Sequence, residues 1–503
     1  MRVRGLLLFF FVLIQQQAFP QSEVVLESFT SAVRTTFEGE PIQKLYNTRM
    51  KSGQFTMVCD SAWRFLERKE LRAFGNIQIE TESELIWADT LFYYDVLELS
   101  NLRGRVVILQ DSTTLFGNAV DYNFATKTAI FLDQIRLEDE DGILTAQTGI
   151  YLELQDSAIF RGQVQIADSG QYAEGDSLFI NRERGYLELF SNIFVEDSTN
   201  NAILTGDYLE ADSTGRRLVI GDAYLRRIEN DTTYASQADS SGVVSAESDS
   251  LLPILTQPDS LIQSPELLPP DSTIITADTS HIFAEVIELI NRDSTTTITA
   301  SDNVTSWSET ISSVSDTLRY NSETERFILT GNPRAWYQRI QLKGPFIFVQ
   351  LDSGQVKELT SHLNAFAVQE DSATGRLHQI RGDTLHAVFE DGNLSTITIN
   401  PDSELLYHTK NEAGEADGAV EYGSPKTTMY FENGELARVV AGQNQGLFLP
   451  EYTDLINRTL KGFDWSPTLR PQKPILIPIS RFGNQPRLQW KALPSRYLEF
   501  IVQ

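Results

Sequence analysis

The sequence predicts an all-β protein made of tandem modules, each built from a repeat of about 29 residues that contains two strands. Three observations support this fold class. Short runs rich in Val, Ile, Leu, Phe and Tyr are separated by turn dipeptides, and no segment of useful length has an apolar stripe with the 3.6-residue period of a helix. Two sets of landmark residues recur in step. The chain of 503 residues, of which 41% are hydrophobic, can bury a sizeable core.

The first residues have the order of a secretory signal peptide, which we place at 1–21. Arg2 and Arg4 precede an apolar run at 6–14, and polar residues with Ala18 follow it. This run of about nine residues is too short to cross a bilayer as a helix, which needs about 20 residues. A buried N-terminal strand is the alternative. The signal predicts an exported, periplasmic chain and leaves an association with the outer membrane open.

The first landmark is a pair of apolar residues that lie two positions apart. The first members of successive pairs are spaced by 29, 29, 29, 29 and 30 residues. Because side chains alternate between the two faces of a strand, both members of a pair point to the same face, which we expect to be buried. The pairs are Ile77/Ile79, Val106/Ile108, Ile135/Leu137, Val164/Ile166, Ile193/Val195 and Ala223/Leu225.

The second landmark is a polar residue that keeps the same period. Its members are Asp60, Asp89, Asn118, Gln147, Asp176 and Asp207. The residues at +2 and +4 are mostly apolar, as in Leu91/Tyr93, Val120/Tyr122, Leu178/Ile180 and Leu209/Ala211. A turn and a second strand complete the unit. One unit cannot bury its inner face alone, so stacked units are expected to share a continuous core.

Interruptions of the repeat divide the chain. Residues 231–280 are rich in Ser, Thr, Asp and Pro, a composition typical of a disordered linker or a long surface insertion. The last residues are basic and rich in Pro, and this tail either docks on an acidic partner or anionic lipid or stays solvated. Helices should be few, with 28–34 as one weak candidate. The predicted organisation is a signal peptide at 1–21, β modules at 40–230 and 281–452 with the linker between them, and the tail at 453–503.

Composition and motifs exclude several function classes. Lys and Arg number 41 against 69 Asp and Glu, so the formal charge of −28 argues against binding to nucleic acid. Cys59 is the single cysteine and can form no intrachain disulfide. The five histidines lack the spacing of a local metal pair, and neither a G-x-S-x-G elbow nor a phosphate-binding loop is present. We therefore expect no enzyme, no cofactor and no metal site.

Several segments resemble the OstA-like, or LptA-like, periplasmic proteins of lipopolysaccharide transport. Residues 75–123 contain GNIQI, WADTLFYYD, LRGRVVI and TLFGNAVDYN, and residues 204–212 read LTGDYLEAD. The segment CDSAW at 59–63 is similar to the longer OstA-like proteins of Bacteroidetes-type bacteria. The resemblance covers about 40–230 well and about 285–450 more loosely.

This resemblance implies an open-ended β-jelly-roll whose two splayed sheets hold lipid acyl chains in an apolar interior. Its partners would be lipopolysaccharide or a related lipid, and other lipopolysaccharide-transport proteins joined by edge-strand pairing. Burying one acyl methylene contributes about 0.8 kcal/mol. The interior, lipid-binding candidates are Ile77, Ile79, Leu91, Tyr93, Val106, Ile108, Val120, Tyr122, Ile135, Leu137, Val164, Ile166, Leu178, Ile180, Ile193 and Val195.

Other readings of the same pattern stay open. Each candidate side chain can be ordinary core, and the whole chain can be a structural or adhesive β-solenoid without lipid cargo. A polysaccharide-degrading β-helix is a further alternative. Its coils are usually about 20–25 residues long, so a unit of about 29 residues disfavours it.

Overall fold

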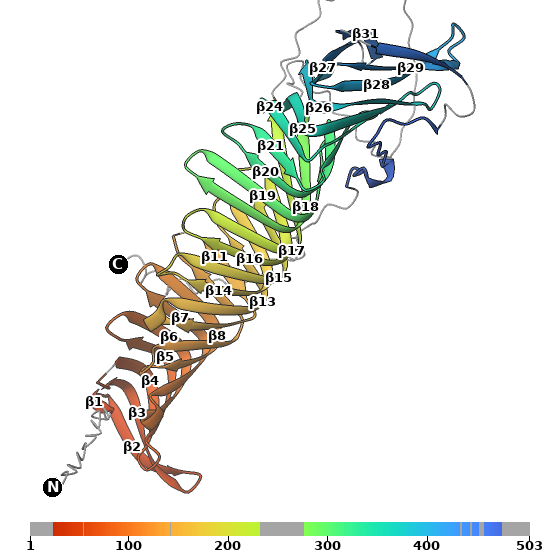
Figure 1. The fold of residues 1–503 in the computed structure, drawn as a ribbon. Helices are drawn as coiled ribbons and strands as arrows, with labels where there is room; N and C mark the ends of the chain where they lie inside the picture. Colours follow the sequence, from red (N-terminus) through yellow and green to blue (C-terminus); the bar gives the residue numbers. More distant parts are fainter. Residues whose placement is uncertain are drawn as a thin grey trace, which may run out of the picture. The chain divides into compact units, whose positions relative to one another are not determined.

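The computed structural model describes residues 24–53, 55–140, 142–231, 276–432, 435–442, 445–451 and 457–474 (Figure 1). Within these residues the regular structure is β-strand apart from short 3-10 segments, such as η1 (Asp95–Leu97), η2 (Glu153–Gln155) and η4 (Pro467–Leu469). The predicted all-β class is confirmed. The predicted signal peptide lies outside the described residues, as do most of the predicted linker and much of the tail.

The chain divides into two compact units. Among the described residues, unit 1 comprises those up to Thr199 together with Leu204–Gly221, and unit 2 comprises Asn200–Ile203 and the residues from Asp222 onward. The strands β16 (Ala202–Asp212) and β17 (Arg216–Asp231) run across this division. The described ends of the predicted linker, 231 and 276–280, are part of strands.

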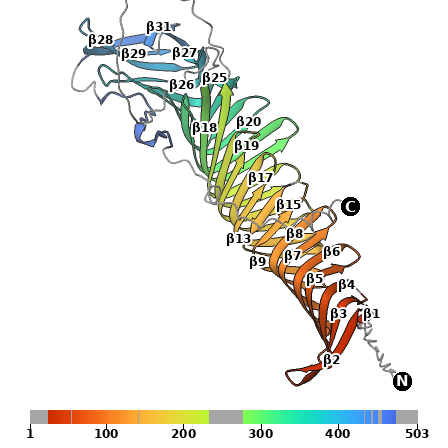
Figure 2. The same ribbon diagram turned by 180° about the vertical axis from the view of Figure 1, so that it is seen from behind.

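Unit 1 is a series of antiparallel strands that follow one another in sequence order (Figures 1 and 2). Its strands are β1 (Val25–Ser28), β2 (Ser31–Phe37), β3 (Glu40–Lys51), β4 (Thr56–Phe65), β5 (Glu70–Glu80), β6 (Glu84–Tyr94), β7 (Leu99–Gln110), β8 (Thr113–Asn123), β9 (Thr128–Asp133), β10 (Ile135–Glu138), β11 (Ile143–Ala146), β12 (Thr148–Leu152), β13 (Ser157–Ala167), β14 (Gln171–Asn181) and β15 (Tyr186–Asp197). β5 begins at Glu70 and β7 at Leu99, so the predicted repeat of 29 residues is one pair of strands with its two turns.

Most long strands of unit 1 bend once, near their middle. The register of β5 with β6, for example, shifts between Phe74 and Ile77. The halves on the two sides of these bends form two walls that meet along the line of bends, which we call the corner. The first wall includes 40–46, 61–65, 70–74, 90–94, 99–103, 119–123, 148–152, 157–161, 177–181 and 186–190, and the second wall includes 48–51, 56–59, 77–80, 84–87, 106–110, 113–117, 135–138, 143–146, 164–167, 171–174 and 194–197.

The corner explains the polar landmark. Gly75 and Asn76 have positive φ angles of 75° and 43°, a backbone that turns the strand at the bulge. On the neighbouring strand Asp60 accepts a hydrogen bond of 2.8 Å from the Asn76 amide. A Cβ atom on Gly75 would lie 2.5 Å from an Asp60 oxygen, so the close approach requires glycine. Asn192 donates to Asp176 in the same way, at 2.6 Å.

Unit 2 continues the pattern with more interruptions. Its strands are β18 (Thr276–Arg292), β19 (Thr295–Trp307), β20 (Ile311–Asn321), β21 (Arg326–Thr330), β22 (Arg334–Tyr337), β23 (Ile340–Lys343), β24 (Phe346–Asp352), β25 (Gln355–Glu370), β26 (Leu377–Glu390), β27 (Asn393–Asn400), β28 (Ser403–Lys410), β29 (Ala416–Ser424), β30 (Thr427–Glu432), β31 (Glu435–Ala441) and β32 (Gln445–Pro450). The corner here separates β21 from β22, β23 from β24 and β27 from β28. These breaks loosen the spacing in the second half of the sequence.

Walls in unit 2 are named as in unit 1. The first wall includes 295–301, 317–321, 326–330, 346–352, 358–362 and 384–390, and the second wall includes 304–307, 312–314, 334–337, 340–343, 365–370 and 379–381. In each unit the inner faces of the two walls carry the apolar residues of the core.

The weak helix candidate at 28–34 is wrong. Ser28 ends β1, residues 29–30 connect the strands, and residues 31–34 belong to β2, where Ser31 pairs with Tyr46 and the following residues continue that antiparallel register. A segment of seven residues is too short to form a stable helix from its own hydrogen bonds, whereas β3 supplies a complete ladder of partners.

Candidate functional site

The predicted lipid-binding residues lie on the inner faces of the walls of unit 1. All of them are buried except Ile166, Ile180 and Val195, which are half-buried. Ile77, Leu91 and Val120, for example, are at most 1% exposed. These side chains are therefore the packed core of unit 1, and their contact with lipid stays a prediction.

The half-buried residues lie together. Ile166 pairs with Ala173, and Ala173 pairs with Val195, so they form one row across β13, β14 and β15 in the second wall. Ile180 pairs with Leu187 in the first wall, and Leu187 is also half-buried. The inner face is therefore less completely covered in the last repeats of unit 1 than in the preceding ones.

Opposite the corner, the hairpins of the two walls face each other at the mouth of unit 1. Polar side chains join the hairpins across this mouth, and we call these the rim contacts. They are Tyr122 Oη to Glu84, Lys127 Nζ to Ser83 Oγ at 3.0 Å, Ser83 Oγ to Glu153 Oε1 at 3.0 Å, Tyr151 Oη to Gln110 Oε1 at 3.0 Å, Arg182 Nη1 to Thr113 Oγ1 at 3.0 Å, Arg182 to Asp139, and Arg217 Nη2 to Gln171 Oε1 at 3.2 Å. The rim contacts hold the apolar interior of unit 1 away from solvent.

Glu84 is the most buried acid among the rim contacts, at 4% exposure. Burial raises the pKa of Glu84 to about 7, while the hydrogen bond from Tyr122 acts in the opposite direction and the charge of Glu153 raises it further. Lys127 lies close by and pairs with Glu153 at 2.7 Å. The net charge of the rim contacts around Glu84 therefore changes near neutral pH.

Unit 2 has an apolar cavity of about 80 Å³ between its walls, which we call the mouth cavity. Wall residues on both sides line it, and it reaches the hairpins at 306–311 and 351–356. In the second wall the inner positions hold Ser306 and Ser313, whose hydroxyls hydrogen-bond at 2.6 Å. The remaining lining includes Ile282, Ile311, Leu318, Phe327, Leu329, Val349, Leu351 and Val356. Small serines in place of aliphatic side chains leave the space that forms the cavity.

Aromatic rings surround the entrance of the mouth cavity. The ring of Trp307 lies 5.5 Å from that of His281, and the Lys473 ammonium lies 5.2 Å from the Trp307 centroid. His281 is buried beside the Tyr224 hydroxyl at 2.9 Å, and burial lowers the pKa of His281. The entrance therefore combines aromatic surface with an ion pair, because Lys473 also contacts the Glu309 carboxylate.

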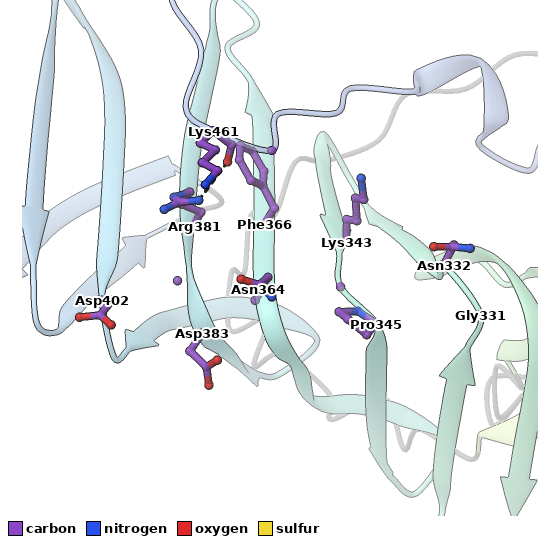
Figure 3. Close-up of a pocket in the computed structure, with 14 residues that line it drawn as sticks. Gly331, Asn332, Lys343, Pro345, Asn364, Phe366, Arg381, Asp383, Asp402 and Lys461 are labelled. Carbon is purple, nitrogen blue, oxygen red and sulfur yellow. Dashed lines mark hydrogen bonds between the residues drawn. The ribbon is translucent and has the colours of Figure 1, made fainter.

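A second, polar pocket of about 740 Å³ lies along the corner of unit 2 (Figure 3). We call it the strap pocket, because residues 457–474, the strap, border it at Lys461 and Gly462. Its lining includes Gly331, Asn332, Lys343, Pro345, Asn364, Phe366, Arg381, Asp383 and Asp402.

The strap is the described part of the predicted tail, and it packs on the chain's own unit 2. Leu460 is buried in a cluster with Phe366 and Val368. Asp464 accepts from Arg334 at 2.7 Å and from Lys343 at 2.8 Å. Burial opposes the charge of Asp464, but these hydrogen bonds outweigh it and hold the pKa of Asp464 below its ordinary value. Neither alternative for the tail, docking elsewhere or solvation, describes this part of it.

Two findings on the described residues concern metal ligands and the single cysteine. No group of three His, Cys, Asp or Glu residues there could hold a metal ion. Cys59 is buried, and burial raises the pKa of its thiol to about 12, which keeps it protonated and unreactive.

The mouth cavity and the strap were not predicted from the sequence. The available signal for the cavity was the serines at inner positions of β19 and β20, where the first half of the chain has aliphatic residues. For the strap it was the apolar residues Leu460, Phe463 and Trp465 within a basic, Pro-rich segment.

A comparison with protein-family models agrees with the resemblance in the first part of the chain. Residues 21–176 match the model of the OstA-like protein family, which confirms the resemblance there. The solved structure of LptH, described as the LptA-homologous periplasmic component of the lipopolysaccharide transport device of Pseudomonas aeruginosa, is similar at 12% identity and a TM-score of 0.23, over 28% of this chain and 95% of that one. No curated protein matches the sequence. Among the described residues, no helix has the length and apolar character needed to cross a membrane.

Proposed function

We propose that this protein is an exported, periplasmic component of lipopolysaccharide transport that holds acyl chains of lipopolysaccharide or a related lipid between its walls. The observation that carries the proposal is the apolar lining of both walls, which in unit 2 reaches solvent through the mouth cavity. The match of residues 21–176 to the OstA-like family supports the same direction.

The mouth cavity is the place where a chain would enter. Its 80 Å³ has room for roughly five to eight water-sized groups. A complete acyl chain therefore requires the walls of unit 2 to separate further. Each methylene that leaves water contributes about 0.8 kcal/mol, which can offset the cost of parting half-buried side chains such as Phe327 and Leu351.

Unpaired strand edges would join the protein to its partners. Among the described strands, β31 pairs with β30 alone and β32 with β29 alone. Apolar side chains on these strands are exposed, with Val440 at 48% and Leu447 at 60%. Strand addition to such an edge satisfies backbone groups and covers the apolar side chains, which is the pairing expected for transport partners.

A structural role without cargo is the second candidate, and the packing of unit 1 favours it. Its inner residues are almost completely buried and its mouth is closed by the rim contacts. If unit 1 never opens, it serves as a rigid support and the lipid site is confined to unit 2.

Site-specific photo-crosslinking distinguishes the two candidates. A photo-reactive residue at Phe327 should label purified lipopolysaccharide, and one at Ile166 should do so if the interior of unit 1 also takes part. The matched control is Arg319, which is exposed on the outer face of β20. Absence of labelling at both inner positions, under conditions where a known carrier is labelled, would exclude the carrier function.

A further inference from the structure

We propose that the strap pocket binds a saccharide that carries one anionic group. This inference is independent of acyl-chain binding, because the pocket lies outside the interior of unit 2. Its volume of about 740 Å³ falls within the range of about 300–1,000 Å³ typical of small-molecule sites.

The pocket follows from breaks in the corner. The strand segments β23 and β24 are separated by Gly344 and Pro345, and β21 and β22 by a turn that includes Gly331 and Asn332. An added Cβ atom at Gly331 would lie 2.3 Å from Asp316, and its φ is 75°, so this position requires glycine; at Gly344 a Cβ atom would lie 2.1 Å from the Ser361 hydroxyl, which would have to move. Interrupted strands and small residues thus leave a hollow along the corner of unit 2.

Corner amides in the strap pocket differ from those in unit 1. In unit 1 the amides of Asn76 and Asn192 donate to an aspartate of the neighbouring strand. Asn332 and Asn364 have the same positive-φ backbone, at 52° and 62°. Both side chains are exposed, and within the described residues neither makes a hydrogen bond to another side chain. These amides, each a donor and an acceptor, are available to a ligand.

Charges in the pocket are separated. In Figure 3, Lys343, Arg381 and Lys461 lie toward the strap, and Asp383 and Asp402 lie toward the opposite end. A ligand that spans the pocket therefore meets donors at one end and acceptors at the other. Saccharide hydroxyls both donate and accept, so they match the acidic end, the Asn364 amide between the two ends and the Asn332 amide at the side of the pocket.

The basic end accommodates a single anionic group. Lys461 is exposed, and among the described residues its ammonium makes no ion pair. Lys343 has one contact, to Asp464, and retains further donors. Arg381 is occupied by Glu404 and by the Lys461 carbonyl at 3.1 Å, so it positions the strap and does not bind the anion. A charge-assisted hydrogen bond from either ammonium group favours phosphate or carboxylate.

The acidic end argues against a ligand with many negative charges. Asp383 and Asp402 would repel a second anionic group, because like charges at short range disfavour each other. Inorganic phosphate alone would reach the ammonium groups but would leave the amides and carboxylates without a partner. A monophosphorylated saccharide uses both ends.

Isothermal titration calorimetry of the mature chain tests this proposal with three probes: trehalose 6-phosphate, trehalose and inorganic phosphate. We expect trehalose 6-phosphate to bind at least tenfold more tightly than either of the others. Lys461→Ala and Asp383→Asn should each weaken its binding about tenfold. Lys357→Ala is the matched control, because Lys357 is exposed in unit 2 and pairs with Asp352 outside the pocket.

Equal binding of all three probes, no binding of any probe, or an unchanged affinity in Lys461→Ala would overturn the proposal. Vesicles that carry lipopolysaccharide form a separate arm: competition between them and trehalose 6-phosphate identifies a glycolipid headgroup as the source, and its absence identifies a free saccharide. Because trehalose 6-phosphate has no acyl chain, its binding tests the pocket even if crosslinking at Phe327 fails.

Discussion

The interiors of the two units share one strand pattern but are filled differently. In the second wall of unit 1 the inner positions hold aliphatic residues such as Ile77 and Val106, each 1% exposed. In the second wall of unit 2, Ser306 and Ser313 occupy inner positions, and the mouth cavity lies beside them. One backbone arrangement therefore gives a sealed core or an accessible cavity, according to the size of a few side chains.

The mouths of the two units also differ: that of unit 1 is closed, and that of unit 2 holds an accessible cavity. Rim contacts such as Arg182 to Thr113 close unit 1, whereas the mouth cavity of unit 2 lies between hairpins that carry Trp307 and Leu351. Under the proposed function, this difference would make unit 1 a support and unit 2 the place of ligand access. The following predictions, from the largest expected effect to the smallest, test that assignment.

Truncation of the core should affect unit 1 most. Leu91→Ala should lower the free energy of unfolding by about 2–5 kcal/mol, because Leu91 is fully buried in a packed interior. Urea unfolding followed by circular dichroism measures the change. Val440→Ala, at a position that is 48% exposed, should change it by less than about 0.5 kcal/mol. A small effect at Leu91 would show that unit 1 is loosely packed.

The free energy of unfolding should depend on pH through the ionisation of Glu84, one of the rim contacts. Burial raises the pKa of Glu84 to about 7, whereas an unfolded chain has about 4.3 for this carboxyl. The folded state then holds the proton more tightly, so this group's contribution falls as pH rises from about 4.3 to about 7. Glu84→Gln lacks this loss, and its stability relative to the wild type should increase by roughly 1–3 kcal/mol over that window.

Urea midpoints at several pH values measure this effect. Glu67→Gln, on an exposed hairpin, is the control and should follow the wild-type profile. A constant difference between Glu84→Gln and the wild type from pH 4 to pH 8 would contradict the prediction.

Filling the mouth cavity should give unit 2 a closed interior like that of unit 1. Ser313→Leu places a large apolar side chain in the space of about 80 Å³. Labelling of lipopolysaccharide from a photo-reactive residue at Phe327 should fall about tenfold, equivalent to about 1.4 kcal/mol. Arg319→Leu adds the same side chain on the outer face of β20 and should leave labelling unchanged. Full labelling in Ser313→Leu would place the acyl chain elsewhere.

Removing one rim contact should loosen the mouth of unit 1. Arg182→Ala deletes the contacts to Thr113 and Asp139, which join the two walls, and should cost about 1 kcal/mol, since the side chain is partly exposed. It should also increase labelling from Ile166. Arg105→Ala removes a comparable ion pair with Asp89 at the corner, and labelling from Ile166 should not respond to it. Equal labelling from Ile166 in the two variants would show that the rim contacts do not control access of lipopolysaccharide to the interior of unit 1.

The regular part of the fold was predictable from the sequence because its signals are local. Side chains such as Ile77 and Ile79 alternate with period two, and the repeat of 29 residues keeps them on one inner face. The polar landmark was also visible as a pattern. Its reason, the hydrogen bond from a corner amide such as Asn76 to Asp60, required the pairing of neighbouring strands.

The contacts that close unit 1 and anchor the strap were not predictable, because they join distant residues. Tyr122 and Glu84 are 38 positions apart, and Gln341 donates to Asp464 across 123 positions. Composition predicted a tail at 453–503, yet Leu460 anchors part of it in the core of unit 2. No local period marks such contacts, since they depend on which turns face each other after folding.

The corner has a consequence for how such a chain can grow. Most long strands of unit 1 bend at the same place in the repeat, and several are held there by a side chain of the preceding repeat, as Asn76 is held by Asp60 and Asn192 by Asp176. Inserting or removing 29 residues therefore preserves the cross-section and changes only the number of layers. The length of unit 1 is therefore set by its number of strand pairs. Duplication or deletion of the gene segment that encodes one pair can change this length and leave the interior of the other pairs as it is.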